Sequence, residues 1–304
     1  MPIIDLNEFS EVVGENLTEL AKEKISKYNF LYSDLAAEEH EMAINQIKEA
    51  TKKPPIISGK HRKKDWESGW RENALAYLKS GSLKEIVPKY FNKFPYVRWN
   101  NKLIKPETKN FEYEMLCALQ YQVFSRWFHD CSHIYEFGCG TGHNLLRVNE
   151  AVTGCNLYGL DWSSSSQELI EYLKNDGKLD CDSAKFDFFN PNYEYKIEEN
   201  SGIYTMAALE QVGQNFKPFV DFLLYKKPRI CVNIEPLVEL FSPSDLELDR
   251  LCVKYCERRN YLTGYLSFLR ELEKDGKINI LQCNRNSIGS LFIEGYSILV
   301  WQVK

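Results

Sequence analysis

A turn rich in glycine and flanked by polar side chains lies near the middle of the chain, in IYEFGCGTGHNLLRV at residues 134–148. Its members are Glu136, Gly138, Gly140, Gly142 and Asn144. A glycine costs roughly 0.5–1 kcal/mol relative to alanine inside a regular element, so a cluster of glycines favours unusual backbone angles or a closely approaching ligand. A glycine turn between a parallel strand and a helix can hold a nucleotide, because the helix start offers unpaired N–H groups.

The spacing of this turn differs from that of a dinucleotide-binding loop. The dinucleotide fingerprint is G-x-G-x-x-G, whereas here His143 occupies the position of the third glycine. Glu136 would also gain nothing from a pyrophosphate, but it could pair with a cationic amino group. These two features argue against a nicotinamide-dependent oxidoreductase and favour a ligand that carries an ammonium group.

The segment EFGCGTG (136–142) resembles the first motif of the class I S-adenosyl-L-methionine-dependent methyltransferases. The resemblance implies that the turn wraps the methionine part of S-adenosyl-L-methionine and that Glu136 helps to hold its ammonium group. The resemblance covers about residues 110–304. The cofactor-binding residues that it implies are Glu136, Gly138, Gly140, Gly142, Asn144, Asp161, Trp162, Asp187 and Phe188.

Two further segments resemble landmarks of the same family. YGLDWS (158–163) ends the next strand, where Asp161 would accept both ribose hydroxyls and Trp162 would lie against the adenine. AKFDFFN (184–190) ends the third strand, where Asp187 would accept from the adenine amino group and Phe188 would lie beside the ring. Each aspartate has a simpler interpretation, Asp161 as a helix N-cap and Asp187 as a turn residue.

Acidic residues follow the next two expected strands. Glu210 lies in MAALEQVG (206–213), and VNIEPLVEL (232–240) contains Glu235 and Glu239. Carboxylates at this edge of the sheet suit a cationic amine or guanidine, because they could pair with its charge and then accept a proton. We therefore predict Glu210 and Glu235 as catalytic residues, although Glu210 and Glu239 could also be surface helix residues.

Three other side chains are candidates for substrate binding beside Glu239. Arg285, in the loop between the last two strands, could hold a carboxylate through two hydrogen bonds, or it could be a solvated loop cation. Tyr261 and Tyr265 are spaced four apart on one helical face and could line the substrate pocket or pack in the core. An acidic pair with an arginine predicts an amino-acid-like substrate such as arginine.

The elements that must position these residues alternate between short apolar runs and helical patterns. The expected strands are 133–137, 156–160, 183–187, 202–206 and 229–234, followed by a terminal antiparallel pair at 277–283 and 291–302. This alternation predicts an α/β fold with a Rossmann-like, seven-stranded, mostly parallel sheet. Residues 111–304 form the expected methyltransferase domain, with a helical insertion at 243–274. The segment Ser242-Pro243-Ser244-Asp245 has the features of a helix start.

Residues 1–110 are predicted to form an N-terminal helical extension. Helical spacing covers 3–50 and roughly 66–92, and FPYVRWNN (94–101) is aromatic and irregular. Because exclusion of water strengthens electrostatic interactions in an active site, we expect the extension to be a lid. FPYVRWNN could equally be a corner where domains pack.

Composition restricts the possible partners and locations. The chain of 304 residues has a net charge of −5, which argues against a nucleic-acid or membrane-surface binder. We expect no signal peptide or transmembrane span, and the odd number of nine scattered cysteines favours reduced thiols in the cytoplasm. His129, Cys131 and His133 lack a second ligand pair, so no metal site is predicted. The sequence does not indicate the oligomeric state.

The sequence therefore predicts a methyltransferase that acts on a small polar molecule, with an amine or guanidine nitrogen as the preferred acceptor. The alternatives are a small-molecule O-methyltransferase and a cofactor-binding scaffold without catalytic activity.

Overall fold

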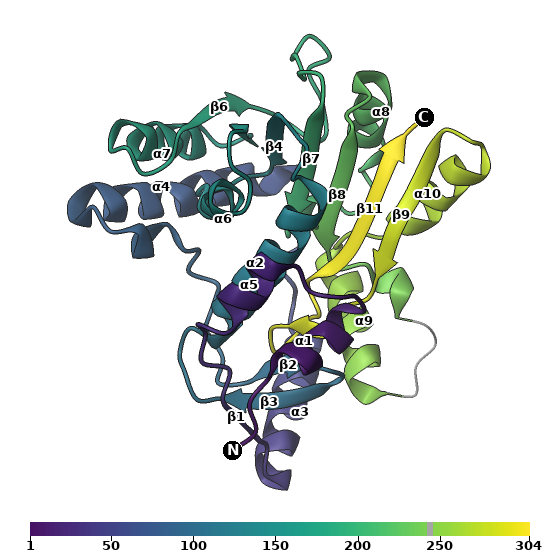
Figure 1. Ribbon diagram of the computed structural model, residues 1–304. Coiled ribbons are helices and arrows are strands. Elements are labelled where there is room, and N and C mark those ends of the chain that lie inside the picture. Colours follow the sequence, from purple (N-terminus) through teal and green to yellow (C-terminus); the bar gives the residue numbers. More distant parts are fainter. Residues whose placement is uncertain (242–245) are drawn as a thin grey trace.

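A seven-stranded sheet forms the centre of the molecule in a computed structural model that describes residues 1–241 and 246–304 (Figure 1). Its strand order is β6-β5-β4-β7-β8-β11-β9. The strands are β4 (His133–Phe137), β5 (Asn156–Asp161), β6 (Cys181–Lys185), β7 (Ser201–Met206), β8 (Ile230–Glu235), β9 (Ile278–Asn284) and β11 (Ser297–Val303). Strands β4 to β8 are parallel, and β11 is antiparallel to both β8 and β9. This topology confirms the predicted fold.

Both faces of the central strands β7 and β8 are buried, which explains why these strands are largely apolar rather than alternating, whereas the edge strands β6 and β9 are partly exposed. Ile134 and Tyr135 are neighbours in β4, yet they belong to different hydrophobic cores on opposite faces. Leu145 of α6 (His143–Ala151) and Leu169 of α7 (Ser164–Asn175) pack in the first core, and Leu223 of α8 (Lys217–Lys226) packs in the second.

The other helices of this part are α5 (Phe111–Trp127), α9 (Glu247–Arg259) and α10 (Tyr265–Lys274), with 3-10 turns η3 (Leu209–Val212) and η4 (Val238–Leu240).

The N-terminal extension contains strands as well as the expected helices. Its elements are α1 (Leu6–Val13), α2 (Glu19–Ile25), β1 (Tyr32–Asp34), α3 (Ala37–Lys52), η1 (Lys60–Arg62), α4 (Lys63–Ser80), η2 (Leu83–Ile86), β2 (Val97–Trp99) and β3 (Lys102–Pro106). A second, antiparallel sheet has the order β1-β3-β2-β10, in which β10 (Ile288–Gly289) comes from the C-terminal part of the chain. The extension and the remainder therefore share a sheet, and they share a hydrophobic core as well.

The segment FPYVRWNN is a fixed corner of this second sheet. Arg98 is fully buried in β2, and its guanidinium donates to the carbonyl oxygens of Leu291, Leu248 and Phe292 at 3.1–3.2 Å. Trp99, the next residue, is also fully buried. This arrangement corresponds to the packing corner that we considered as the alternative to a mobile cover.

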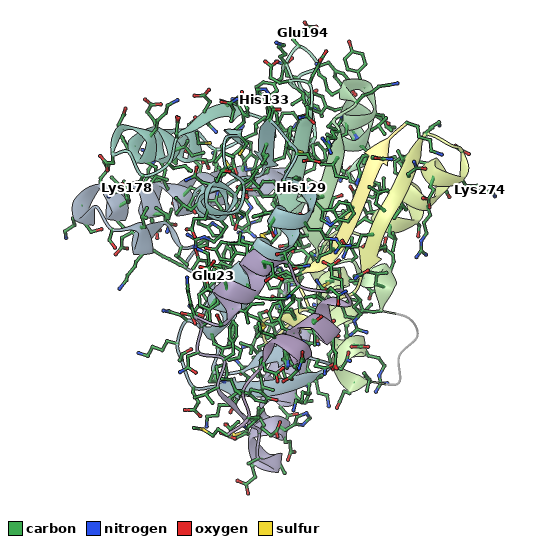
Figure 2. The ribbon with its side chains drawn as sticks, in the orientation of Figure 1. Glu23, His129, His133, Lys178, Glu194 and Lys274 are labelled. Atoms are coloured by element: carbon green, nitrogen blue, oxygen red, sulfur yellow. The ribbon has the colours of Figure 1, made fainter. Side chains whose placement is uncertain are left out.

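The outer surface carries the charged side chains expected of a globular chain. Glu23, Lys178, Glu194 and Lys274 project from the periphery (Figure 2). Within residues 1–241 and 246–304, no helix combines the length and apolarity needed to cross a membrane. The expected helix start at Ser242–Asp245 lies outside the described residues.

Candidate functional site

The glycine turn between β4 and α6 needs glycine for two separate reasons. Gly138, Gly140 and Gly142 have φ angles of 79°, 53° and 75°, a region that other L-residues rarely adopt. A side chain would also have little room. A Cβ atom on Gly138 would lie 2.5 Å from the Cβ of Ala208, and one on Gly140 would lie 2.9 Å from the ring of Trp70.

Asp161 connects the end of β5 to this turn. Its Oδ2 accepts a hydrogen bond from the backbone N–H of Gly140 at 3.0 Å, and its Oδ1 accepts one from Ser163 at 2.8 Å. Burial raises the pKa of the Asp161 carboxyl to about 6, against the opposing effect of these two N–H groups. A carboxylate oxygen has more than one lone pair, so Asp161 can still accept from hydroxyl groups of a ligand.

Glu136 lies behind the turn in a buried polar network. Its oxygens accept from the Asn144 amide at 2.6 Å and from the Tyr204 hydroxyl at 2.9 Å. Burial raises the pKa of Glu136 to about 8. The Asn144 carbonyl oxygen in turn accepts from Gln120 at 2.5 Å. Asn144 and Glu136 are therefore a buried, hydrogen-bonded pair behind the turn, and neither lines the cavities described below.

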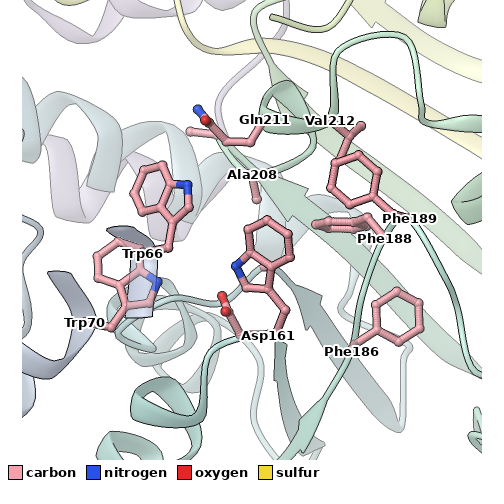
Figure 3. Close-up of a pocket in the computed structure, with 12 residues that line it drawn as sticks. Trp66, Trp70, Asp161, Phe186, Phe188, Phe189, Ala208, Gln211 and Val212 are labelled. Carbon is pink, nitrogen blue, oxygen red and sulfur yellow. The ribbon is translucent and has the colours of Figure 1, made fainter. Parts of the chain in front are cut away.

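A cavity lies directly over Asp161 and the glycine turn; we call it the tryptophan cavity. It is lined by Trp66, Trp70, Gly138, Asp161, Trp162, Phe186, Phe188, Phe189, Ala207, Ala208, Gln211 and Val212, and its volume is about 70 Å³. Figure 3 shows Trp66 and Trp70 on one side of this cavity and the phenylalanines on the other. Asp187 is not among the lining residues, and its Oδ1 accepts from the backbone N–H of Phe189, as in the turn role we considered for it.

Helix α4 of the extension supplies the two tryptophans, which sequence reasoning did not assign to the site. Trp66 and Trp70 stack with ring centroids 5.3 Å apart. Between them, Glu67 caps the N-terminus of α7. Its carboxylate accepts from the Ser163 hydroxyl, the Ser164 N–H, and the N–H and hydroxyl of Ser165, at 2.6–3.2 Å. The spacing of Trp66 and Trp70 shows that they lie on one side of the helix. Only the tertiary structure, in which Glu67 contacts the start of α7, shows that this side lines the tryptophan cavity.

A second and larger cavity adjoins the first; we call it the tyrosine cavity. Its lining includes Tyr90, Tyr255, Tyr261, Tyr296, Glu112, Glu210, Arg259 and Phe292, and its volume is about 340 Å³. The two cavities share Trp66, Ala207 and Gln211 as lining residues. They therefore meet just beyond the carboxyl end of β7.

Glu235 and Glu210, the two predicted catalytic acids, have different surroundings. The Glu235 carboxylate is fully buried and accepts from the backbone N–H groups of Ala208, Leu209 and Glu210 at 3.0–3.2 Å. Glu210 accepts one hydrogen bond from Gln211, whereas its buried Oε2 has no partner. Burial and the nearby charge of Glu235 raise the pKa of Glu210 to about 8. Glu210 thus faces the tyrosine cavity, and Glu235 supports the turn that carries it.

Arg285 is placed differently from the clamp that we expected. Its guanidinium pairs with Glu294 at 2.8 Å and with Asp249 at 2.6 Å, and it lies over the ring of Phe241. It lines neither the tryptophan cavity nor the tyrosine cavity. Arg285 lies in a loop directly after β9, as the sequence predicted. Its N–H groups donate to Asp249 of α9 and to Glu294 of the loop before β11, and these ion pairs connect the two segments.

Of the other candidate substrate-binding residues, two have structural contacts and one lines a cavity. Tyr265 is fully buried and its hydroxyl donates to Asn233 at 2.8 Å. Glu239 accepts from the backbone N–H of Leu266 at the start of α10. Tyr261 alone of this group lines the tyrosine cavity.

Comparisons with known proteins find similar folds among solved structures. No protein-family model matches this sequence, and no curated protein matches it either. The structure of the [4+2]-cyclase SpnF matches with a TM-score of 0.51 and 14% identity, over 83% of this chain and 99% of SpnF. The chain therefore shares its Rossmann-like α/β fold with SpnF.

Two methyltransferase structures are similar at lower TM-scores. The plantazolicin methyltransferase BpumL, solved in complex with SAH, matches with a TM-score of 0.47 and 14% identity, over 86% of this chain and 99% of its own. The mitomycin 7-O-methyltransferase MmcR matches with a TM-score of 0.44 and 14% identity, over 79% of this chain and 68% of its own. At such identities the likeness concerns the fold, and function has to be argued from the site.

Proposed function

We propose that this chain is an S-adenosyl-L-methionine-dependent methyltransferase that acts on a small polar molecule. We further propose an amine or guanidine nitrogen of an amino-acid-like compound as the preferred acceptor. The observation that carries the proposal is the junction of two cavities at the carboxyl end of β7. One is formed by the glycine turn and Asp161, and the other contains Glu210. Ligands of open α/β sheets bind at this edge.

The residues around the tryptophan cavity fit the cofactor. Asp161 offers a carboxylate for ribose hydroxyls, and Trp162 and Phe188 offer aromatic faces for an adenine. Gly138 lines this cavity with its backbone, and a Cβ there would lie only 2.5 Å from the Cβ of Ala208. Asn144 and Glu136, a hydrogen-bonded pair next to the turn, are our candidates for holding the ammonium group.

When bound, S-adenosyl-L-methionine supplies a methyl group on a positively charged sulfur. The protein then has to align an uncharged nucleophile and take up its proton. Glu210 is suited to that task, because it faces the second cavity and its pKa of about 8 lies near physiological pH. Glu235 would keep Glu210 in place through the backbone of η3.

The fold alone leaves other reactions open, since SpnF is a cyclase. An O-methyl acceptor or a scaffold without catalysis would use the same cofactor residues. The test therefore has to measure methyl transfer as well as binding.

Titration of S-adenosyl-L-methionine into wild type and Asp161→Ala tests the cofactor assignment. Loss of a charge-assisted hydrogen bond is worth about 1.5–3 kcal/mol, so we expect at least roughly tenfold weaker binding. Asp182→Ala is the matched control, because Asp182 lies on the neighbouring strand β6, is mostly exposed and pairs with Lys174. Equal affinity in all three proteins would contradict the cofactor assignment.

A screen for transfer of a labelled methyl group to amines, guanidines, phenols and carboxylates then tests the proposed acceptor. Methylation of phenols or carboxylates alone would contradict a nitrogen acceptor.

A further inference from the structure

The tyrosine cavity contains two charged groups whose hydrogen-bonding capacity is not used. Glu210 is 7% exposed, and its Oε2 has no hydrogen-bond partner. The Nε of Arg259 is buried and also has no partner. Because a buried polar atom without a partner costs about 1–3 kcal/mol, each atom marks a place where a ligand would be stabilising.

The acidic part of this cavity contains a second carboxylate. Glu112, at the start of α5, is 8% exposed and accepts one hydrogen bond from the backbone N–H of Asn92. Both carboxylates line the tyrosine cavity, together with Tyr90 and Tyr296. A cationic group between them could pair with both.

The basic part of the cavity is formed by Arg259 of α9. Its guanidinium lies over the rings of Tyr255 and Tyr261, and one Nη donates to the Tyr261 hydroxyl at 3.1 Å. Within the described ranges, no carboxylate forms an ion pair with Arg259. Arg259 and Glu210 line the same cavity without pairing, which leaves room for a ligand between them.

We propose that the tyrosine cavity is the acceptor site and that it binds a small zwitterion with a flat apolar body. Its amino group lies between Glu210 and Glu112, and its carboxylate lies at Arg259. This inference rests on the proposed function for the role of the site, and it replaces Arg285 by Arg259 as the carboxylate-binding residue.

The size and walls of the cavity determine the body of the ligand. A volume of about 340 Å³ lies at the small end of the range for ligand pockets, which suits a compound of amino-acid size. Tyrosine faces favour flat apolar groups, and they also attract ammonium groups. An aromatic amino acid combines all three requirements.

Binding of three compounds with one body tests the proposal without any turnover. These are L-phenylalanine, phenethylamine, which lacks the carboxylate, and 3-phenylpropionate, which lacks the amine. Binding can be followed by titration calorimetry and by the tryptophan fluorescence of the protein, to which Trp66 contributes as a residue that lines both cavities. We expect L-phenylalanine to bind at least tenfold more tightly than either analogue. Equal or weaker binding of L-phenylalanine would overturn the proposal.

Two substitutions should then produce opposite selectivity. Glu112→Gln should weaken L-phenylalanine and phenethylamine severalfold and leave 3-phenylpropionate unchanged. Arg259→Met should weaken L-phenylalanine and 3-phenylpropionate and leave phenethylamine unchanged. The matched controls are Glu114→Gln on α5 and Arg258→Met on α9, which line neither cavity. A uniform loss for all three compounds would show structural damage and contradict the assigned roles.

The same titrations separate this inference from the proposed function. If S-adenosyl-L-methionine binds but the zwitterion has no advantage, the inference fails and the proposed function stands. If the zwitterion binds with the crossed selectivity but S-adenosyl-L-methionine does not bind, the acceptor cavity is a binding site for another reaction and the proposed function fails.

Discussion

Glu235 and Glu210 show how two neighbouring carboxylates acquire different tasks from their surroundings. Three backbone N–H groups point at the Glu235 carboxylate, whereas Glu210 has one amide partner and one free oxygen. A carboxylate that accepts several N–H bonds stabilises the fold, and one buried without partners costs stability. Glu210 therefore has the properties of a functional residue and Glu235 those of a positioning residue.

The two residues should respond differently to the same substitution. In Glu235→Gln an amide NH₂ replaces one acceptor oxygen, so we expect destabilisation of about 1–3 kcal/mol and a melting temperature lower by several degrees. In Glu210→Gln, measured at pH 9, we expect an unchanged or higher melting temperature, because a buried charge is removed. Thermal unfolding of both variants checks the difference. A similar fall in both would mean that Glu210 also supports the fold.

At the scale of elements, α4 is the part of the extension that covers the tryptophan cavity. Trp70 lies so close to Gly140 that even a methyl group there would contact its ring. The tryptophan cavity is accordingly small, and a nucleotide-sized ligand would require Trp66 and Trp70 to move aside. The contacts that hold α4 in place include the Glu67 carboxylate at the start of α7 and the Tyr77 hydroxyl, which donates to Asp176 just after α7 at 2.7 Å. We therefore propose that α4 is the lid over the tryptophan cavity, whereas FPYVRWNN contributes only Phe94, to the wall of the tyrosine cavity.

Loss of the Glu67 contact should loosen α4. Glu67→Gln removes the charge that caps α7, worth roughly 1 kcal/mol, and we expect faster amide hydrogen exchange in residues 63–80. Residues 97–99 of β2 should be unaffected, because they are buried and paired on both sides. Glu72→Gln is the matched control on the same helix, where an exposed glutamate pairs with Lys89. Unchanged exchange in α4 would show that Glu67 does not hold the helix.

At the scale of the whole molecule, four buried glutamates affect how stability depends on pH. Burial raises the pKa of Glu112 and Glu235 to about 7 and that of Glu136 and Glu210 to about 8. A raised pKa means that the folded state holds the proton more tightly than the unfolded state. Stability therefore decreases as pH rises from the unfolded to the folded pKa. His143, whose pKa burial lowers to about 3, has the opposite effect, but only below about pH 6.5.

The protein should accordingly become less stable between pH 6.5 and pH 8.5. We expect the melting temperature to fall over this interval and the fall to be smaller in Glu136→Gln, because one pKa unit corresponds to about 1.4 kcal/mol. Glu41→Gln, at an exposed position of α3, is the control that should follow wild type. A melting temperature that rises with pH in this interval would contradict the raised pKa values.

The sequence by itself determined the central sheet and the turn at its edge. The alternation of apolar runs and helical patterns was sufficient for the strands β4, β5, β7 and β8, because the inner strands of a parallel sheet need largely apolar segments. The polar edge strand β6 begins two residues before the expected strand 183–187. The three glycines, Asp161 and Phe188 could be located because they follow strand ends, and Asp161 and Phe188 do line one cavity. The short strands β1, β2 and β3 gave no such signal, since their pairing depends on residues far away in the chain.

Only the tertiary structure decided which side chains surround the second cavity. Glu112, Arg259 and Tyr296 come from three separate segments, and no local pattern brings them together. Arg285 is the opposite case. An arginine in a loop near a strand end suggests a ligand-binding residue, and only the structure shows that Asp249 and Glu294 pair with it. Periodicity reports which face of an element is buried, but the identity of the facing partner depends on long-range packing.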